Sequence, residues 1–218
     1  LCRADSEEEE DILFTRKQIE NFDYIIDKLE ENEIDLGKIH LQNSYGITTY
    51  RDIHRDLARP GIILYGVPCD PCDKILSKLP ENEQFKPTMS LRCKVAMVKD
   101  VPAGENIGYG NNFTTPQPMK IATITIGYAD GFSRAVSKKD FKVLVNGQYG
   151  RIIGNVCMDQ TMIDASNIDN IKEGDIVTLF GQDGDYYLPV NQLSELSGTI
   201  TNETLSCIGS RVERVYHL

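Results

Sequence analysis

Apolar side chains near the start of the chain recur at helical spacing within a segment that is edged with acidic residues. Four of them occupy positions i, i+3, i+4 and i+7, which lie on one face of a helix. These are Phe22, Ile25, Ile26 and Leu29. Ser6 and Glu9 have the spacing of a capping box, so the pattern predicts an amphipathic helix that begins close to Ser6.

Shorter segments follow, and they alternate between strand and helix patterns. Lys38–Leu41 and Ile62–Leu64 are predicted to be strands, and the stretch from Ile47 to Leu57 is predicted to be helical. A complete eight-stranded α/β barrel takes roughly 250 residues, whereas only about two strand and helix units fit here. We therefore expect residues 1–82 to form the C-terminal part of a TIM-like α/β barrel.

From residue 83 onward, apolar and polar positions alternate, and this period belongs to strands. The pair Asn146-Gly147 is typical of a hairpin turn, and Val190–Leu196 has the apolar positions of a short helix. We predict a mainly β domain over residues 83–218. Its expected strands are Leu91–Val98, Ile121–Ile126, Phe141–Val145, Arg151–Ile153, Val156–Ile163 and Asp175–Leu179.

Charge and cysteine usage narrow the classes of function. With 33 acidic and 23 basic residues, the surface should repel nucleic-acid backbones, so we expect no nucleic-acid partner. No apolar run approaches the roughly 20 residues that span a bilayer. Six cysteines without dense spacing indicate a reducing compartment, so we expect this portion in the cytoplasm. Cys69 and Cys72 have the spacing of half a metal site, but no second pair completes it, and we expect an ordinary loop and no metal.

Four motifs follow one another along the chain: Arg59–Gly66 (RPGIILYG), Ile107–Gly110 (IGYG), Gly127–Arg134 (GYADGFSR) and Asn155–Gln160 (NVCMDQ). These motifs and their order resemble the alanine racemase family. The resemblance implies the C-terminal part of a pyridoxal 5'-phosphate enzyme that is built from a barrel and a β domain. The family's cofactor lysine belongs to an N-terminal half that this sequence does not contain. Because the sequence also lacks a start methionine, we expect a piece of a longer protein, whose missing partner is the N-terminal half of the barrel.

Racemisation requires two opposed acid/base groups and an electron sink. In the family, the lysine serves one face of the substrate, and the other face is served by a tyrosine that matches Tyr109 and reaches into the partner subunit's site. The resemblance therefore implies a homodimer in which Tyr109 is catalytic. A tyrosine with a pKa of about 10 is a poor base at neutral pH unless cationic neighbours favour the phenolate. Without the resemblance, a tyrosine between two glycines is more often a residue packed in a strand.

Further matches concern the cofactor. Arg59 resembles the arginine that donates to the pyridine nitrogen, while Ser44, Gly61 and Ile62 match the contacts of the phosphate. A guanidinium can only donate, so it would leave the pyridine nitrogen unprotonated. Without the resemblance, Arg59 could instead cap a helix or pair with Asp56, and Ser44 could belong to a helix N-cap.

The remaining matches concern the substrate and its entrance. Met158 matches a residue whose backbone N–H contacts the substrate carboxylate across the subunit interface, and Asp159 is its neighbour. Tyr128 matches a tyrosine that narrows the entrance. Asp5 and Arg134 match polar residues farther out, so these residues form an expected gate.

Two positions depart from the common pattern. Asn202 stands where alanine racemases typically carry a tyrosine that crowds the substrate methyl group, and a smaller amide would give space and hydrogen-bonding groups to the hydroxyl of serine. This feature resembles the serine/alanine racemases of vancomycin-resistance systems, whose racemase domain follows a membrane domain, so an upstream membrane tether stays open. Asn202 is also consistent with a turn or cap residue. Asn155 stands where many relatives have arginine.

The leading hypothesis is a racemase that interconverts L- and D-serine, with alanine as a second substrate, for peptidoglycan precursors. A strict alanine racemase, a related barrel-type amino-acid decarboxylase and a non-catalytic half of a racemase are the alternatives. Racemisation, carbon dioxide release or the absence of turnover would separate them.

Overall fold

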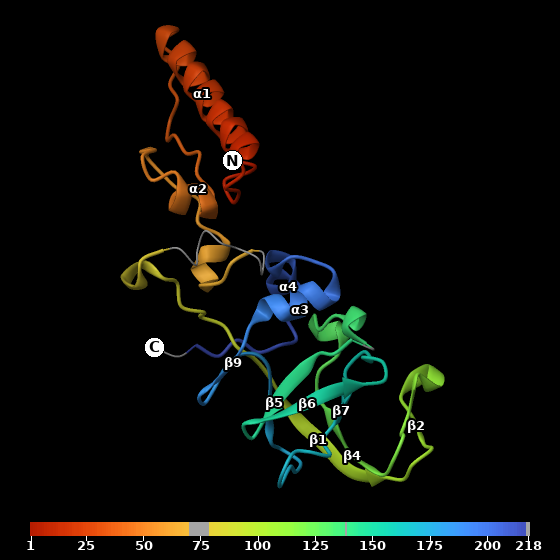
Figure 1. Ribbon diagram of the computed structural model, residues 1–218. Coiled ribbons are helices and arrows are strands. Elements are labelled where there is room, and N and C mark those ends of the chain that lie inside the picture. The colour runs from red at the N-terminus through yellow and green to blue at the C-terminus, as the bar shows by residue number, and fades with distance from the viewer. Residues whose placement is uncertain (70–78, 138, 217–218) are drawn as a thin grey trace. The chain divides into compact units, whose positions relative to one another are not determined.

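The structure is a computed structural model that describes residues 1–69, 79–137 and 139–216 (Figure 1). The chain divides into two compact units. The first contains Leu1–Pro68 and extends again to Pro87, and the second contains Cys69 and continues from Thr88. The predicted loop of Cys69 and Cys72 reaches beyond the described residues. In the described part of the chain, no helix is both long and apolar enough to cross a membrane.

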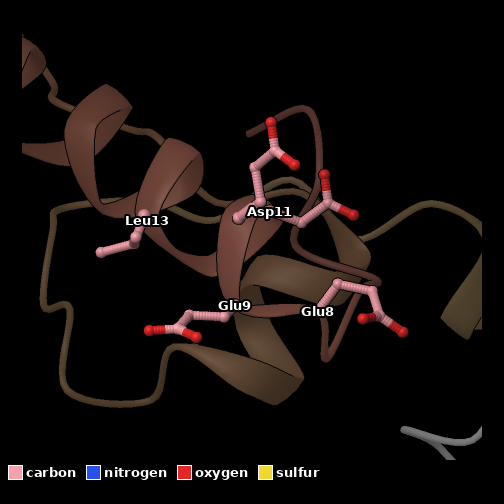
Figure 2. A pocket seen from close by; sticks show the side chains of 5 residues that line it. Glu8, Glu9, Asp11 and Leu13 are labelled. Carbon is pink, nitrogen blue, oxygen red and sulfur yellow. The ribbon is translucent and has the colours of Figure 1, made fainter.

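Helix α1, Glu9–Glu31, is the longest element of the first unit. Three of its predicted apolar residues are half-buried, whereas Ile25 is 54% exposed. The predicted capping box is wrong, because Ser6 Oγ accepts from the Glu8 N–H and Glu8 occupies the N-cap without a side-chain bond. Figure 2 shows the carboxylates of Glu8, Glu9 and Asp11 at this end. Their charge complements the helix dipole, which stabilises the start of α1 in place of the capping box.

The rest of the first unit contains short helical turns: α2 (Ser44–Thr49), the 3₁₀ turn Ile62–Tyr65 and the 3₁₀ turn Glu81–Glu83. The strand predicted at 62–64 is therefore wrong. The predicted helix at 47–57 is also wrong over most of its length, since α2 ends at Thr49. The predicted strand 38–41 is reduced to one parallel bridge between His40 and Leu57.

The second unit is organised around an antiparallel sheet. In the described residues, the sheet has seven strands in the order β1-β4-β7-β6-β5-β8-β9. An additional pairing of β1 with β8 closes six of them into a ring, which leaves fewer strand edges open. The strands are β1 (Leu91–Val101), β4 (Met119–Ile124), β5 (Lys142–Val145), β6 (Gln148–Ile153), β7 (Thr161–Asp164), β8 (Ile176–Asp183) and β9 (Tyr186–Leu188).

The core of the second unit confirms the predicted alternation. Phe132 and Phe141 are fully buried, with ring centroids 5.6 Å apart. The turn between β5 and β6 has φ of 53° at Asn146 and 74° at Gly147, as a hairpin turn requires. The strand predicted at 156–163 is wrong in its first half, because β7 begins only at Thr161. In the preceding residues, the carbonyls of Cys157 and Met158 instead accept hydrogen bonds from the N–H groups of Tyr128 and Ala129.

Two further parts complete the second unit. A small ribbon pairs β2 (Asn106–Ile107) with β3 (Phe113–Thr114), and Ile107 joins a buried cluster with Ile121 and Ile153. Helices α3 (Val190–Ser197) and α4 (Thr201–Ser206) pack on each other (Figure 1). The helix predicted at 190–196 is confirmed by α3.

Candidate functional site

In the first unit, Ser44 and Gly61 lie together although 17 positions separate them. Asn43 caps α2 by accepting from the Gly46 N–H, and this leaves the hydroxyl of Ser44 to accept from the Gly61 N–H at 2.9 Å. A Cβ placed on Gly61 would meet only Ser44 Oγ, at 3.6 Å. The backbone at Gly61 is therefore open to a close approach.

The N–H groups that follow Gly61 start a helical turn, and such groups have no partner within a helix. Ile62 is buried, and no acceptor is bonded to the N–H of Ile62 or Ile63 among the described residues. These donors and the hydroxyl of Ser44 are the groups that an anion binds.

Two backbone carbonyls hold Arg59, one through its main-chain N–H and the other through its side chain. Its N–H donates to the Gln42 carbonyl at 3.0 Å, and its guanidinium donates to the Leu41 carbonyl, also at 3.0 Å. Asp56 instead accepts from the Ile39 N–H, so the alternative pairing of Arg59 with Asp56 is not observed. The guanidinium is exposed, and among the described residues it makes this one hydrogen bond, which leaves its other N–H donors for a ligand.

Asp5 lies in the turn before α1 and is exposed. The pKa of the Arg3 guanidinium is raised, first by its hydrogen bond with Asp11 and then by the negative charges of Asp11 and Asp5. Among the described residues, no hydrogen bond or ion pair joins Asp5 to Ser44, Arg59 or Gly61.

In the second unit, Tyr109 begins a 3₁₀ turn that connects β2 to β3. The turn needs glycine on both sides of the tyrosine, because φ is 73° at Gly108 and 77° at Gly110. The side chain of Tyr109 is 78% exposed, so the alternative of a tyrosine packed in a strand is wrong. A hollow of about 380 Å³ borders it, with Lys99 and Cys157 also in its lining.

Two of the four motifs pack directly on each other. The Tyr128 N–H donates to the Cys157 carbonyl and the Ala129 N–H donates to the Met158 carbonyl, each at 3.0 Å. A Cβ on Gly127 would lie 2.3 Å from both carbonyl oxygens, so only glycine permits this approach. The expected gate residue and the expected substrate contact are thus brought together. Among the described residues, the Met158 N–H has no acceptor.

An arginine that the sequence did not single out ties the same two motifs. Arg211 Nη2 lies 2.6 Å from Asp159 Oδ1, and its Nε lies 3.4 Å from Asp130 Oδ1. Asp130 Oδ2 in turn accepts from the Gly127 N–H at 3.0 Å. The hydrogen bond to Asp159 raises the pKa of Arg211. No periodicity or local motif marks this residue, since it contacts segments 52 and 81 positions away.

Arg134 is exposed and follows Asp130 by four positions in the same motif. It begins the 3₁₀ turn Arg134–Val136, and its carbonyl accepts from the Ser137 N–H. The hydroxyl of Ser137 accepts from the Val156 N–H at 2.9 Å, which connects this turn to the segment of Met158.

Asn202 is half-buried on the first turn of α4. Its Oδ1 is buried and lacks a hydrogen-bond partner among the described residues, and so does the Oγ1 of Thr201. The alternative of an N-cap is wrong, because Ile200 occupies that position. A buried acceptor without a donor is a costly arrangement that a ligand hydroxyl could relieve.

The expected site residues therefore form two groups, one in each unit. Asp5, Ser44, Arg59, Gly61 and Ile62 belong to the first unit, and Tyr109, Tyr128, Arg134, Met158, Asp159 and Asn202 belong to the second.

Comparison with known proteins covers both units. The family model described as "Alanine racemase, C-terminal domain" matches residues 88–216, and "Alanine racemase, N-terminal domain" matches residues 1–68. The alanine racemase of Methanococcus maripaludis is 39% identical over 207 residues, which are 94% of this chain and 53% of that protein. The chain thus spans about half the length of the relatives it matches.

Solved structures of alanine racemases also match this chain over nearly its whole length. Alanine racemase from Clostridium difficile 630 in complex with cycloserine has a TM-score of 0.86 at 36% identity, over 99% of this chain and 54% of that one. Alanine racemase from Bartonella henselae with covalently bound pyridoxal phosphate has a TM-score of 0.78 at 31% identity, over 99% and 54%.

The likeness includes the N-terminal domain model, so it is not confined to the C-terminal domain. The fold predicted from the sequence is confirmed: the first unit is the C-terminal part of an α/β barrel, and the second is mainly β. Since the C-terminal model alone matches more than half of the 218 residues, the chain belongs to the alanine racemase family, whose members depend on pyridoxal phosphate.

Proposed function

We propose that this chain supplies part of the active site of a pyridoxal-phosphate-dependent racemase that interconverts L- and D-alanine. The observation that carries the proposal is Tyr109, which stands 78% exposed on a glycine-flanked turn in a member of this family. An exposed phenol can reach a reacting centre in another polypeptide, whereas a packed one cannot. Tyr109 would give or take the α proton on one face of the substrate.

The first unit fits the cofactor. Ser44 Oγ, the exposed backbone of Gly61 and the N–H of Ile62 are suited to the phosphate group. Arg59 is suited to the pyridine nitrogen, because its guanidinium donates and never accepts. When bound, pyridoxal phosphate supplies the electron sink that makes the α proton of an amino acid removable.

The second unit fits the substrate. The N–H of Met158, which has no acceptor among residues 1–69, 79–137 and 139–216, would bind a carboxylate, and the bonds from Tyr128 and Ala129 to the Cys157-Met158 segment fix where that N–H points. Tyr128, Asp159 and Arg134 would line the entrance, and Asp5, which belongs to the first unit, is the remaining gate residue that the resemblance implies. The second acid/base group would be a lysine from outside this sequence.

We further propose that the enzyme is a homodimer in which Tyr109 and Met158 of one subunit complete the barrel site of the other. The D-amino acid produced would enter peptidoglycan precursors. A cytoplasmic location, and a membrane tether upstream, stay predictions.

A second candidate is activity on serine, which one observation favours. Asn202 Oδ1 is buried and has no donor in the part of the chain that the structure describes, and the hydroxymethyl group of serine carries a donor that alanine lacks. This observation supports a kinship in specificity with the serine/alanine racemases of vancomycin-resistance systems, although the relatives compared above carry the name alanine racemase.

The test is an assay of the full-length source protein with pyridoxal phosphate on L-alanine and L-serine in parallel. We expect turnover of alanine, and we expect Asn202→Tyr to lower serine turnover selectively. Alanine turnover alone, unchanged in the variant, would contradict the serine proposal. Release of carbon dioxide would indicate a decarboxylase, and a protein without turnover would be a non-catalytic half of a racemase.

A further inference from the structure

The turn that carries Tyr109 has few anchors of its own. The flanking strands β2 and β3 contain two residues each, and φ is positive at Gly108, Gly110 and Asn111. A side chain that is 78% exposed obtains no orientation from packing. Any fixed direction of the Tyr109 phenol must therefore come from its backbone.

One buried side chain contacts that backbone. Asn155 is 6% exposed, and its Nδ2 donates to the Tyr109 carbonyl at 2.8 Å. The contact joins residues 46 positions apart, and it connects the Tyr109 turn to the segment that carries Met158. The hydrogen bond therefore depends on the tertiary fold and not on a local sequence pattern.

Asn155 lies within van der Waals reach of both glycines of the turn. A Cβ on Gly110 would be 3.8 Å from Asn155 Nδ2, and a Cβ on Gly108 would be 3.9 Å from the Asn155 backbone nitrogen. A Cβ on Gly154 would lie 3.1 Å from the Ile107 carbonyl oxygen. The Gly154-Asn155 step therefore packs against the base of the turn, from β2 to Gly110.

We propose that Asn155 is a positioning residue that sets the direction of the Tyr109 phenol by holding the Tyr109 carbonyl. In this role Asn155 acts through the backbone of the turn. The inference rests on the proposed function for its kinetic consequence, but the contact itself does not. A donor is essential at this position, since the Tyr109 carbonyl can only accept.

The substitution Asn155→Asp preserves shape and removes the donor. The carboxylate would face a carbonyl oxygen, so the turn should move away and become more mobile. Asn155→Ala removes the donor without adding charge. Asn106→Asp is the matched control, because it adds the same charge to β2 while its oxygen can still accept from Thr114 Oγ1, as it does now at 2.8 Å.

The first readout is amide hydrogen exchange of residues 107–113 in the full-length protein. We expect faster exchange in Asn155→Asp and Asn155→Ala, and wild-type exchange in Asn106→Asp. Thermal unfolding establishes that each variant is folded. If Asn155→Asp does not fold, Asn155→Ala carries the same prediction. Wild-type exchange in a folded Asn155→Ala would overturn the proposal.

The second readout is the deuterium isotope effect on racemisation of α-deuterated alanine, measured from each enantiomer. Misplacing one of two acid/base groups slows proton transfer on one face, and displacement by about 1 Å can lower turnover by about 100-fold. We expect a lower kcat, with the isotope effect raised for one enantiomer only. Equal changes for both enantiomers would overturn the positioning role. Faster exchange in a protein whose wild type does not racemise would support the contact and contradict the proposed function.

Discussion

The two units hold their proposed site residues in different ways. In the β unit, the segments of Tyr109, Tyr128 and Met158 are joined to one another by backbone bonds, by Asn155 and by Arg211. In the described part of the barrel unit, Ser44 holds Gly61 and one carbonyl holds the Arg59 guanidinium. The β unit thus resembles a preformed surface, whereas the barrel unit presents N–H donors that no described residue engages.

The largest effect is expected where backbones approach most closely. Gly127→Ala would place a Cβ 2.3 Å from two carbonyl oxygens, so we expect it to lower the free energy of unfolding by roughly 2 to 3 kcal/mol. Gly61→Ala is the matched substitution in the barrel unit, where the Cβ would meet only Ser44 Oγ, at 3.6 Å. Because φ of −125° with ψ of −96° lies outside the main regions open to alanine, we expect a loss of about 1 kcal/mol, smaller than that of Gly127→Ala. Chemical denaturation of both variants measures this, and equal losses would contradict the difference between the units.

A smaller effect is expected from Arg211→Gln. The ion pairs of Arg211 with Asp130 and Asp159 are screened by solvent, but the Asp130 side chain is only 12% exposed. We expect a small drop in Tm that disappears at high salt, together with weaker substrate binding. Lys17→Gln in the barrel unit removes a pair with Glu20 that is exposed on both sides, and its Tm should not change. A larger drop for Lys17→Gln would count against this account.

The smallest effect concerns acid. The hydrogen bond from Arg3 lowers the pKa of Asp11 to about 2 from its ordinary 3.8. A carboxylate with a depressed pKa stabilises the fold above its ordinary pKa, and the contribution is lost as pH falls through the folded value. Stability of the barrel unit should therefore decline between about pH 4 and pH 2. When helicity is followed during an acid titration, the Asp11→Asn variant should lack this decline. The same decline in the variant would show that the Arg3–Asp11 pair does not stabilise the barrel unit.

The sequence predicted the β unit well, because strand alternation is a local signal and its strands find their partners within the unit. The helix at 190–196 and the turn at Asn146-Gly147 were predicted for the same reason. The elements at 38–64 were largely wrong, since parallel barrel strands depend on distant neighbours that no local pattern describes. Their residues formed short turns instead.

The site was predictable only in part. Glycine-flanked Tyr109 and the Cys-Met-Asp-Gln segment could be identified from motifs. Asn155 was noticed only as a departure from relatives, and Arg211 was missed, because both act through contacts between segments far apart in the chain. The predicted capping box of Ser6 was wrong because α1 starts with a carboxylate-rich turn that needs no hydroxyl cap.

The central claim is that each active site combines Tyr109 of one subunit with the barrel residues of the other. It is tested most directly by mixing two full-length variants, Tyr109→Phe and Arg59→Ala, under conditions that exchange subunits. Each variant alone should lose racemisation by about 10²- to 10⁴-fold. A hybrid dimer would contain one site with both residues intact, so the mixture should recover about a quarter of wild-type activity if subunits exchange at random. No recovery, with hybrid dimers demonstrated by native mass spectrometry, would contradict the account.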